Sequence, residues 1–222
     1  MKNLIIFGLF ALCVSSVYGA KEKKEKVNPY QTQGTEEYAN VTSKLIGVWN
    51  IDSYKKSGKE MIGISFETAT VEFTDFDAEA KSAKAVFTFV LKKDIVDNRI
   101  STWNKKETTL TVDKYEIVCT VDYSFNLKGI LVYLENQKST VSLQGSGDQL
   151  TNFELKEKAF IESQSQMKSS GGLGNLAMAG VLKSVTGTDF VPNIPDQVNY
   201  KNLTESGVEL TTLTKTSFKL SK

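Results

Sequence analysis

The sequence predicts an all-β fold in which an antiparallel sheet either closes into a barrel or packs as a sandwich. Two segments, Ala83 to Leu91 and Tyr115 to Phe125, alternate apolar and polar residues with a period of two. This alternation is typical of strands that are buried on one face and wet on the other. Turn-forming residues separate these segments from other short strand-like runs, and little helix is expected between them. Close to ten short strands in one chain indicate a sandwich or a barrel.

Residues 1–19 have the three parts of a cleavable secretory signal peptide. Lys2 supplies the positive start, Leu4 to Val17 is almost wholly apolar, and small residues stand at the −3 and −1 positions of the cleavage site. The apolar run is shorter than the roughly 20 residues that cross a bilayer, so no integral membrane anchor is expected. Cys13 follows Leu12 rather than a small residue, which favours cleavage over lipidation. We expect export to the periplasm, the cell envelope or the exterior.

Charge and cysteine content limit the partners of the exported chain. Removing residues 1–19 removes one of the 27 basic residues and leaves 26 basic against 26 acidic residues. A neutral chain has no electrostatic reason to bind nucleic acid or an anionic membrane surface. Residues 20–34 are polar and without periodicity, which predicts a flexible linker before one domain over 35–222.

Cys119 is the single cysteine that remains after residues 1–19 are removed, so no internal disulfide is expected. Its place on an apolar face predicts a buried, inert thiol.

The elements of the domain follow one another in a simple order. Thr35 to Ser43 is expected to form a short helix, with Thr35 as its cap. The strand candidates after it are Leu45–Tyr54, Ile62–Phe66, Ala69–Phe76, Ala83–Leu91, Thr108–Val112, Tyr115–Phe125, Gly129–Leu134, Ser139–Leu143, Leu150–Lys156 and Val208–Leu220. The expected turns are Ser57-Gly58, Asp97-Asn98, Asn126 to Gly129, Gly145 to Asp148 and Ser206-Gly207.

One segment in the C-terminal half departs from this strand-rich pattern. Gly171, Gly172 and Gly174 open a stretch of small apolar residues, and Asn175 to Val185 is expected to form one short helix. Such a helix must bury its apolar face, and the largest apolar surface available is the end of a barrel. It is either a mobile lid over a cavity or an element that completes the core. The second interpretation is favoured.

Two segments resemble the ends of a known type of barrel. The opening strand Gly47-Val48-Trp49 and the closing hairpin from Tyr200 to Leu210 are similar to those of lipocalins and their bacterial lipocalin-like relatives. The resemblance implies an antiparallel β-barrel that a short helical turn precedes. It also implies that Trp49 closes the floor of the barrel, underneath a later strand.

A barrel of about eight strands is wide enough to hold one small ligand or to be filled by its own side chains. The aromatic residues expected on its inner wall, and therefore the candidate ligand-binding residues, are Trp49, Phe66, Phe73, Phe87, Phe89, Tyr123 and Phe125. Core packing is the simpler role for each of them. If the volume of the barrel exceeds what its side chains fill, these rings form the wall of a site for a small hydrophobic ligand, and this partner ranks slightly ahead of the alternative. The alternative is a filled barrel that acts as a structural or protein-interaction domain of the cell envelope.

Catalytic chemistry has no clear basis in the sequence. The chain contains no histidine, which removes the commonest general base and the commonest zinc ligand. Gly171 to Gly174 lacks the lysine and the strand–helix setting of a phosphate-binding loop. We therefore expect a protein that is not an enzyme, with no catalytic residue, metal ligand or cofactor.

The signal peptide can be tested directly by mass spectrometry. Protein collected after export should have the intact mass of a chain cleaved near Gly19, because signal peptidase recognises the small residues before that bond. A mass that retains residues 1–19, or that corresponds to a chain starting at a lipidated Cys13, would contradict the prediction.

Overall fold

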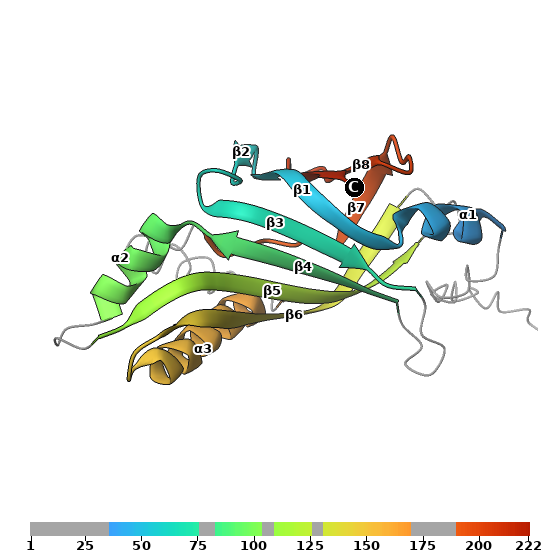
Figure 1. Cartoon of the computed structure of the whole chain (residues 1–222). Coiled ribbons are helices and arrows are strands. Elements are labelled where there is room, and N and C mark those ends of the chain that lie inside the picture. Colours follow the sequence, from blue (N-terminus) through green and yellow to red (C-terminus); the bar gives the residue numbers. More distant parts are fainter. Residues whose placement is uncertain (1–35, 76–82, 104–108, 126–130, 170–189) are drawn as a thin grey trace, which may run out of the picture.

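The computed structural model describes residues 36–75, 83–103, 109–125, 131–169 and 190–222. Over these residues the chain is mostly antiparallel β-sheet that curls into a half-barrel, with helices at its margins (Figure 1). The strands are β1 (Gly47–Lys56), β2 (Lys59–Glu60), β3 (Phe66–Phe73), β4 (Ala83–Leu91), β5 (Thr111–Phe125), β6 (Leu131–Ser146), β7 (Gln197–Lys201), β8 (Gly207–Thr211) and β9 (Ser217–Ser221). The helices are α1 (Glu36–Leu45), α2 (Lys93–Trp103) and α3 (Leu150–Ser169).

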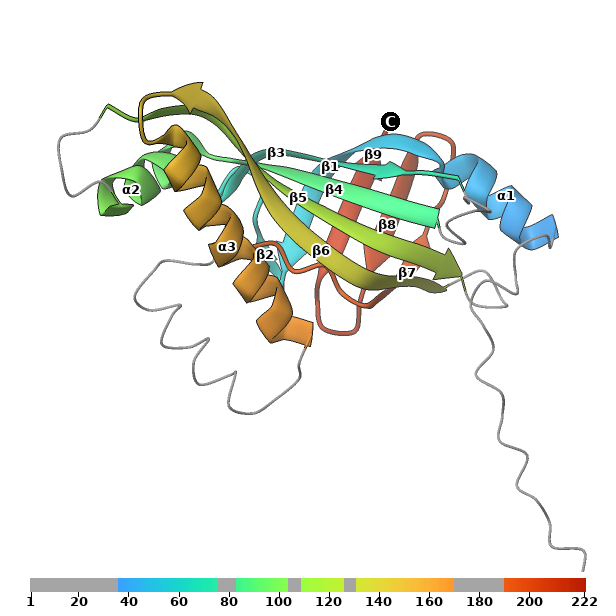
Figure 2. The ribbon, with the colours of Figure 1, turned by 90° about the horizontal axis from the view of Figure 1, so that it is seen from below.

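The strands pair in a continuous line that returns to its beginning. From β3 to β9 each strand is antiparallel to the next one, and β1 pairs with both β3 and β9. The N-terminal half of β1, Gly47 to Asn50, pairs with β3, whereas Asn50 to Lys55 pairs with β9. The junctions on either side of β7 are short, since β6 and β7 pair only over Leu131 to Tyr133 and β7 and β8 only over Asn199 to Lys201. The sheet is therefore curled tightly near α1 and open where β5 and β6 extend beyond their neighbours (Figure 2).

Alternation along the central strands holds as the sequence predicts. In β4 the side chains of Ala83, Ala85, Phe87, Phe89 and Leu91 are buried, and those between them are exposed or half-buried. The register pairs Phe87 with Cys119 of β5, which places both on the inner face. The thiol of Cys119 is buried, as predicted. The predicted helix before β1 is confirmed as α1, and Tyr200 to Leu210 lies in the hairpin of β7 and β8.

Several predicted strands are parts of longer ones. The two strands predicted at Thr108–Val112 and Tyr115–Phe125 are one strand, β5, and those predicted at Gly129–Leu134 and Ser139–Leu143 are one strand, β6. Each long strand contains one extra residue at a register shift, near Lys114 in β5 and around Asn136 in β6. Such bulges bend a strand without ending its pairing.

The strand predicted over Leu150–Lys156 is wrong, because this segment is the first part of α3. The buried residues Phe153, Glu157 and Ile161 recur every four positions, which is the spacing of one helix face. The turn predicted at Asp97-Asn98 is also wrong, since both residues lie inside α2. Here Val96, Arg99 and Trp103 follow the helical period.

Smaller differences lie at other edges of the sheet. Ile62 to Phe66 forms a turn rather than a strand, in which the carbonyl of Met61 accepts the backbone N–H groups of Ser65 and Phe66. Val208 to Leu220 is a hairpin of two strands, β8 and β9, rather than one strand. The signal peptide, the linker, the turn at residues 126–129 and the helix predicted over Asn175–Val185 lie outside the described residues.

Helix α3 lies alongside β6 in both Figure 1 and Figure 2. The part of β6 from Ser139 to Ser146 contains no charged residue and no proline, the residues that usually protect an exposed sheet edge. A helix that covers an edge strand serves the same purpose. We therefore interpret α3 as the element that covers the part of β6 that does not pair with β7.

Replacing Trp49 tests whether the sheet depends on its inner side chains. Trp49 is entirely buried, whereas its neighbour Val48 is 59% exposed on the same strand. Trp49→Ala should lower the free energy of unfolding by about 3–5 kcal/mol, as for other large core aromatics. Val48→Ala is the control and should change it by less than about 0.5 kcal/mol. Urea denaturation measures both variants, and equal effects would contradict the arrangement of β1.

Candidate functional site

The predicted aromatic residues lie on the inner face of the curled sheet. Six of them are buried with at most 1% of their surface exposed: Trp49, Phe66, Phe73, Phe87, Phe89 and Tyr123. Phe125 ends β5, and its side chain lies outside what the structure describes. The inner face is thus an aromatic wall that five neighbouring positions of β3, β4 and β5 provide, with Trp49 on β1.

Most of these rings touch one another. The centroids of Phe66 and Phe89 are 4.9 Å apart. Phe73 meets Tyr123 edge-on at 5.5 Å, and the rings of Phe87 and Phe89 are parallel at 6.5 Å. Aromatic pairs in these geometries contribute about 0.5–1.5 kcal/mol beyond the burial of their surface. The described rings of the wall therefore form a cohesive core.

Two aromatic residues of the wall were missed by sequence reasoning. Tyr54 and Phe218 stack in parallel with centroids 4.8 Å apart, and Tyr54 also lies 5.4 Å from Phe89. Strict alternation from Trp49 places Ser53 inside and Tyr54 outside. A register shift between Ile51 and Ser53 reverses this order and turns Tyr54 inward.

Trp49 stands apart from this group, at the end of the sheet near α1. Its indole Nε1 donates a hydrogen bond of 2.7 Å to the carbonyl of Leu45, in the last turn of α1. The ammonium of Lys222 lies 4.6 Å from the centroid of its ring, a cation–π contact. The same ammonium donates to the carbonyls of Lys44 and Ile46. A positive charge at the C-terminus of a helix is favourable, so Lys222 stabilises both α1 and Trp49.

A polar cluster occupies the open end of the sheet, between α2, α3 and β5. Arg99 of α2 and Glu157 of α3 form two parallel hydrogen bonds, from Nε and from an Nη of Arg99 to the two carboxylate oxygens. The hydroxyl of Tyr115 in β5 donates to the same carboxylate at 2.8 Å. Both Glu157 and Tyr115 are buried. Burial, followed by the negative charge of Glu157, raises the pKa of Tyr115 far above its usual range. The hydroxyl therefore stays protonated and remains a donor.

Arg99 is the only arginine in the sequence, among 27 basic residues. Its guanidinium also lies over two rings, 4.7 Å from the centroid of Phe160 and 4.9 Å from that of Phe190. Arginine suits this position because its planar fork binds both carboxylate oxygens and stacks on aromatic faces, which lysine does not do. A single arginine in a chain otherwise rich in lysine is the signal that would have drawn attention to this cluster.

The polar groups of the cluster bind one another. Each charged group has a close partner, and no side chain of the cluster is left as a free base or nucleophile. No group of three or more potential metal ligands occurs among the described residues. Within the same part of the chain, no helix is long and apolar enough to cross a membrane.

The described surface also has a concavity of about 590 Å³ over β3, β4 and β5. Thr68, Thr70 and Thr88 line it together with charged residues such as Lys114 and Glu116, which pair with each other at 2.8 Å. A smaller concavity of about 330 Å³ adjoins α2. None of the predicted aromatic residues lines either of these two hollows, so neither is the predicted ligand site.

Comparison with family models, with curated proteins and with solved structures finds no match to this chain. The resemblance to lipocalins therefore rests on the residues of this chain alone.

Breaking the buried ion pair should destabilise the open end of the sheet. Arg99→Met leaves the buried carboxylate of Glu157 without its cation, which typically costs about 3–5 kcal/mol. The double variant Arg99→Met with Glu157→Leu should recover most of that loss, because an apolar pair removes the unpaired charge.

Urea denaturation of both variants measures this cycle. Lys93→Met is the matched control, since Lys93 forms an exposed pair with Asp97 on the same helix. It should change stability by less than about 1 kcal/mol. If Arg99→Met costs no more than this control, the buried pair is not what joins α2 to α3.

Proposed function

We propose that this chain is an exported, non-catalytic, lipocalin-like protein that binds one small apolar ligand within its curled sheet. The observation that carries the proposal is the closure of the sheet at one end. There Trp49, in the Gly-x-Trp strand, is held between the carbonyl of Leu45 and the ammonium of Lys222. A strand of this kind, with its tryptophan buried beside a preceding helix, is what the lipocalin resemblance implies.

The strand order supports the same proposal. Sequential antiparallel pairing from β3 to β9, with β1 joined to both ends, is the order of an up-and-down barrel. In a barrel that is closed at the end near Trp49, a ligand would enter from the opposite end. The inner wall is apolar and aromatic, which suits an apolar ligand better than a charged one.

A second candidate function is favoured by the contacts among the rings. Tyr54, Phe89 and Phe218 pack on one another at distances that leave no room between these particular rings. A sheet filled in this way serves as a structural or protein-interaction domain of the envelope rather than as a container.

Native mass spectrometry of protein purified from its source distinguishes the two functions. A binding protein should carry a lipid-sized adduct that delipidation removes, and added dodecanol should then raise the melting temperature. Phe89→Leu should weaken this thermal shift, because Phe89 lies on the inner wall. Val90→Leu, which changes the next residue on the opposite face, should not.

The absence of an adduct from the native protein, together with no thermal shift from dodecanol, would overturn ligand binding and support the filled domain. An adduct that Phe89→Leu and Val90→Leu affect equally would contradict the inner wall as the binding site.

A further inference from the structure

Two hairpin turns meet at the end of the molecule where β1 finishes. The first is the turn Ser57-Gly58 between β1 and β2, and both of its residues have positive φ angles, 53° and 83°. Tight two-residue turns of this kind are rigid and well suited to hairpins. The second is the turn between β8 and β9. The backbone N–H of Gly58 donates to the carbonyl of Lys215 at 2.9 Å, so the two turns are joined.

The second turn holds a leucine in solvent. Leu213 is 95% exposed, although leucine gains most from burial. Its neighbour Thr212 fixes the turn: its backbone N–H donates to Thr216, and its hydroxyl accepts the N–H groups of Thr214 and Thr216. Because the turn is tied in this way, Leu213 cannot fold back onto the sheet without breaking these bonds. The apolar side chain is therefore presented outward by a preorganised element.

Exposed lysines lie on and beside the two joined turns. Lys55 and Lys59 of the first hairpin and Lys215 of the second are exposed. The one acidic residue among them, Glu60, turns its carboxylate toward Ser53 and the backbone N–H groups of Tyr54 and Met61. The chain without residues 1–19 is neutral overall, so this end concentrates cations that the rest of the molecule balances.

We propose that the two joined turns, residues 55–60 and 212–216, form a docking surface for an anionic lipid bilayer. Leu213 enters the headgroup region while Lys55, Lys59 and Lys215 contact the negative headgroups. One apolar side chain on turns that carry lysines offers too little apolar area for a stable protein interface, whereas peripheral lipid binding needs only partial insertion plus charge. Threonine hydroxyls beside the leucine suit the same hydrated interface. The proposal does not depend on ligand binding inside the sheet.

Vesicle co-sedimentation tests the proposal with the purified exported protein, whose N-terminus is first established by intact mass. The vesicles contain equal parts of phosphatidylglycerol and phosphatidylcholine, and vesicles of phosphatidylcholine alone serve as the reference. The protein should bind the anionic vesicles, bind the neutral ones weakly, and dissociate as salt is raised. Leu213→Ser should weaken binding about tenfold, through the loss of one inserted leucine. Lys55→Glu with Lys215→Glu should weaken it by at least about tenfold.

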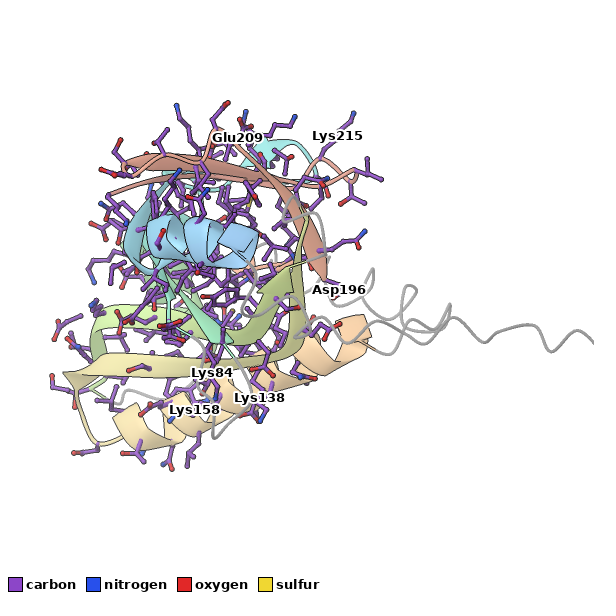
Figure 3. The ribbon with its side chains drawn as sticks, turned by 90° about the vertical axis from the view of Figure 1, so that its right-hand side faces the viewer. Lys84, Lys138, Lys158, Asp196, Glu209 and Lys215 are labelled. Carbon is purple, nitrogen blue, oxygen red and sulfur yellow. The ribbon has the colours of Figure 1, made fainter. Side chains whose placement is uncertain are left out.

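Matched controls come from other faces of the molecule. Leu155 of α3 is 60% exposed, and Leu155→Ser should leave vesicle binding unchanged. Lys84 and Lys138 project from the side opposite to Lys215 (Figure 3), so Lys84→Glu with Lys138→Glu should also have little effect. Unchanged melting temperatures establish that every variant is folded.

Three results would overturn the proposal. The first is equal binding to anionic and neutral vesicles, and the second is no binding to either. The third is a loss of binding that the control variants share. Stable capture of a protein partner through Leu213, with no vesicle binding, would also overturn it and identify the turns as a protein interface.

Discussion

The pairing of β1 with both β3 and β9 is the contact on which the curled sheet depends. The two halves of β1 pair with different strands, the first half with β3 and the second with β9. The change of partner occurs at Asn50, which pairs with both β3 and β9, and the register shift that turns Tyr54 to the inner face follows between Ile51 and Ser53. Without that bulge the rings of Tyr54 and Phe218 would not stack. The change of partner strand and the bulge that brings Tyr54 into the core thus lie next to each other on β1.

The open end of the sheet is held by different forces. There β5 and β6 extend beyond their neighbours, and α2 and α3 supply the packing that further strands would provide. The fork of Arg99 on Glu157 sets the distance between the two helices, because both hydrogen bonds require one fixed orientation. Tyr115 then fixes the pair against β5. A purely apolar contact would be less directional, so the buried charges give this end a definite geometry.

Sequence reasoning found the strands with clear alternation and failed where another signal was needed. β4 was predicted with its bounds because five small or apolar residues alternate without interruption. The segment Leu150–Lys156 was misread because its three apolar residues, Leu150, Phe153 and Leu155, suit a short strand as well as a helix. Only the burial of Phe153, Glu157 and Ile161 at helical spacing decides between them. Because Glu157 lies on this face, the apolar repeat that usually marks the buried face of a helix is interrupted in the sequence.

The same reasoning placed most of the aromatic wall but not its polar counterpart. Alternation is a local property, and it located Phe87 and Phe89 without knowledge of the rest of the chain. Arg99, Tyr115 and Glu157 come from three separate elements, and nothing local to any of them predicts that they meet. Lys222 is a similar case, since its contact with Trp49 joins residues that are far apart in the sequence.

The position of Lys222 over Trp49 has a mechanical consequence. The end of β9 lies beside the beginning of β1, since Ser221 pairs with Asn50. A force applied through α1 and Lys222 therefore pulls two antiparallel strands apart from their shared end. In that direction the hydrogen bonds break one after another, rather than together as they do when strands slide past each other. Under such a force β9 should separate from β1 one residue pair at a time. The contact between the ammonium of Lys222 and the indole of Trp49 should break first.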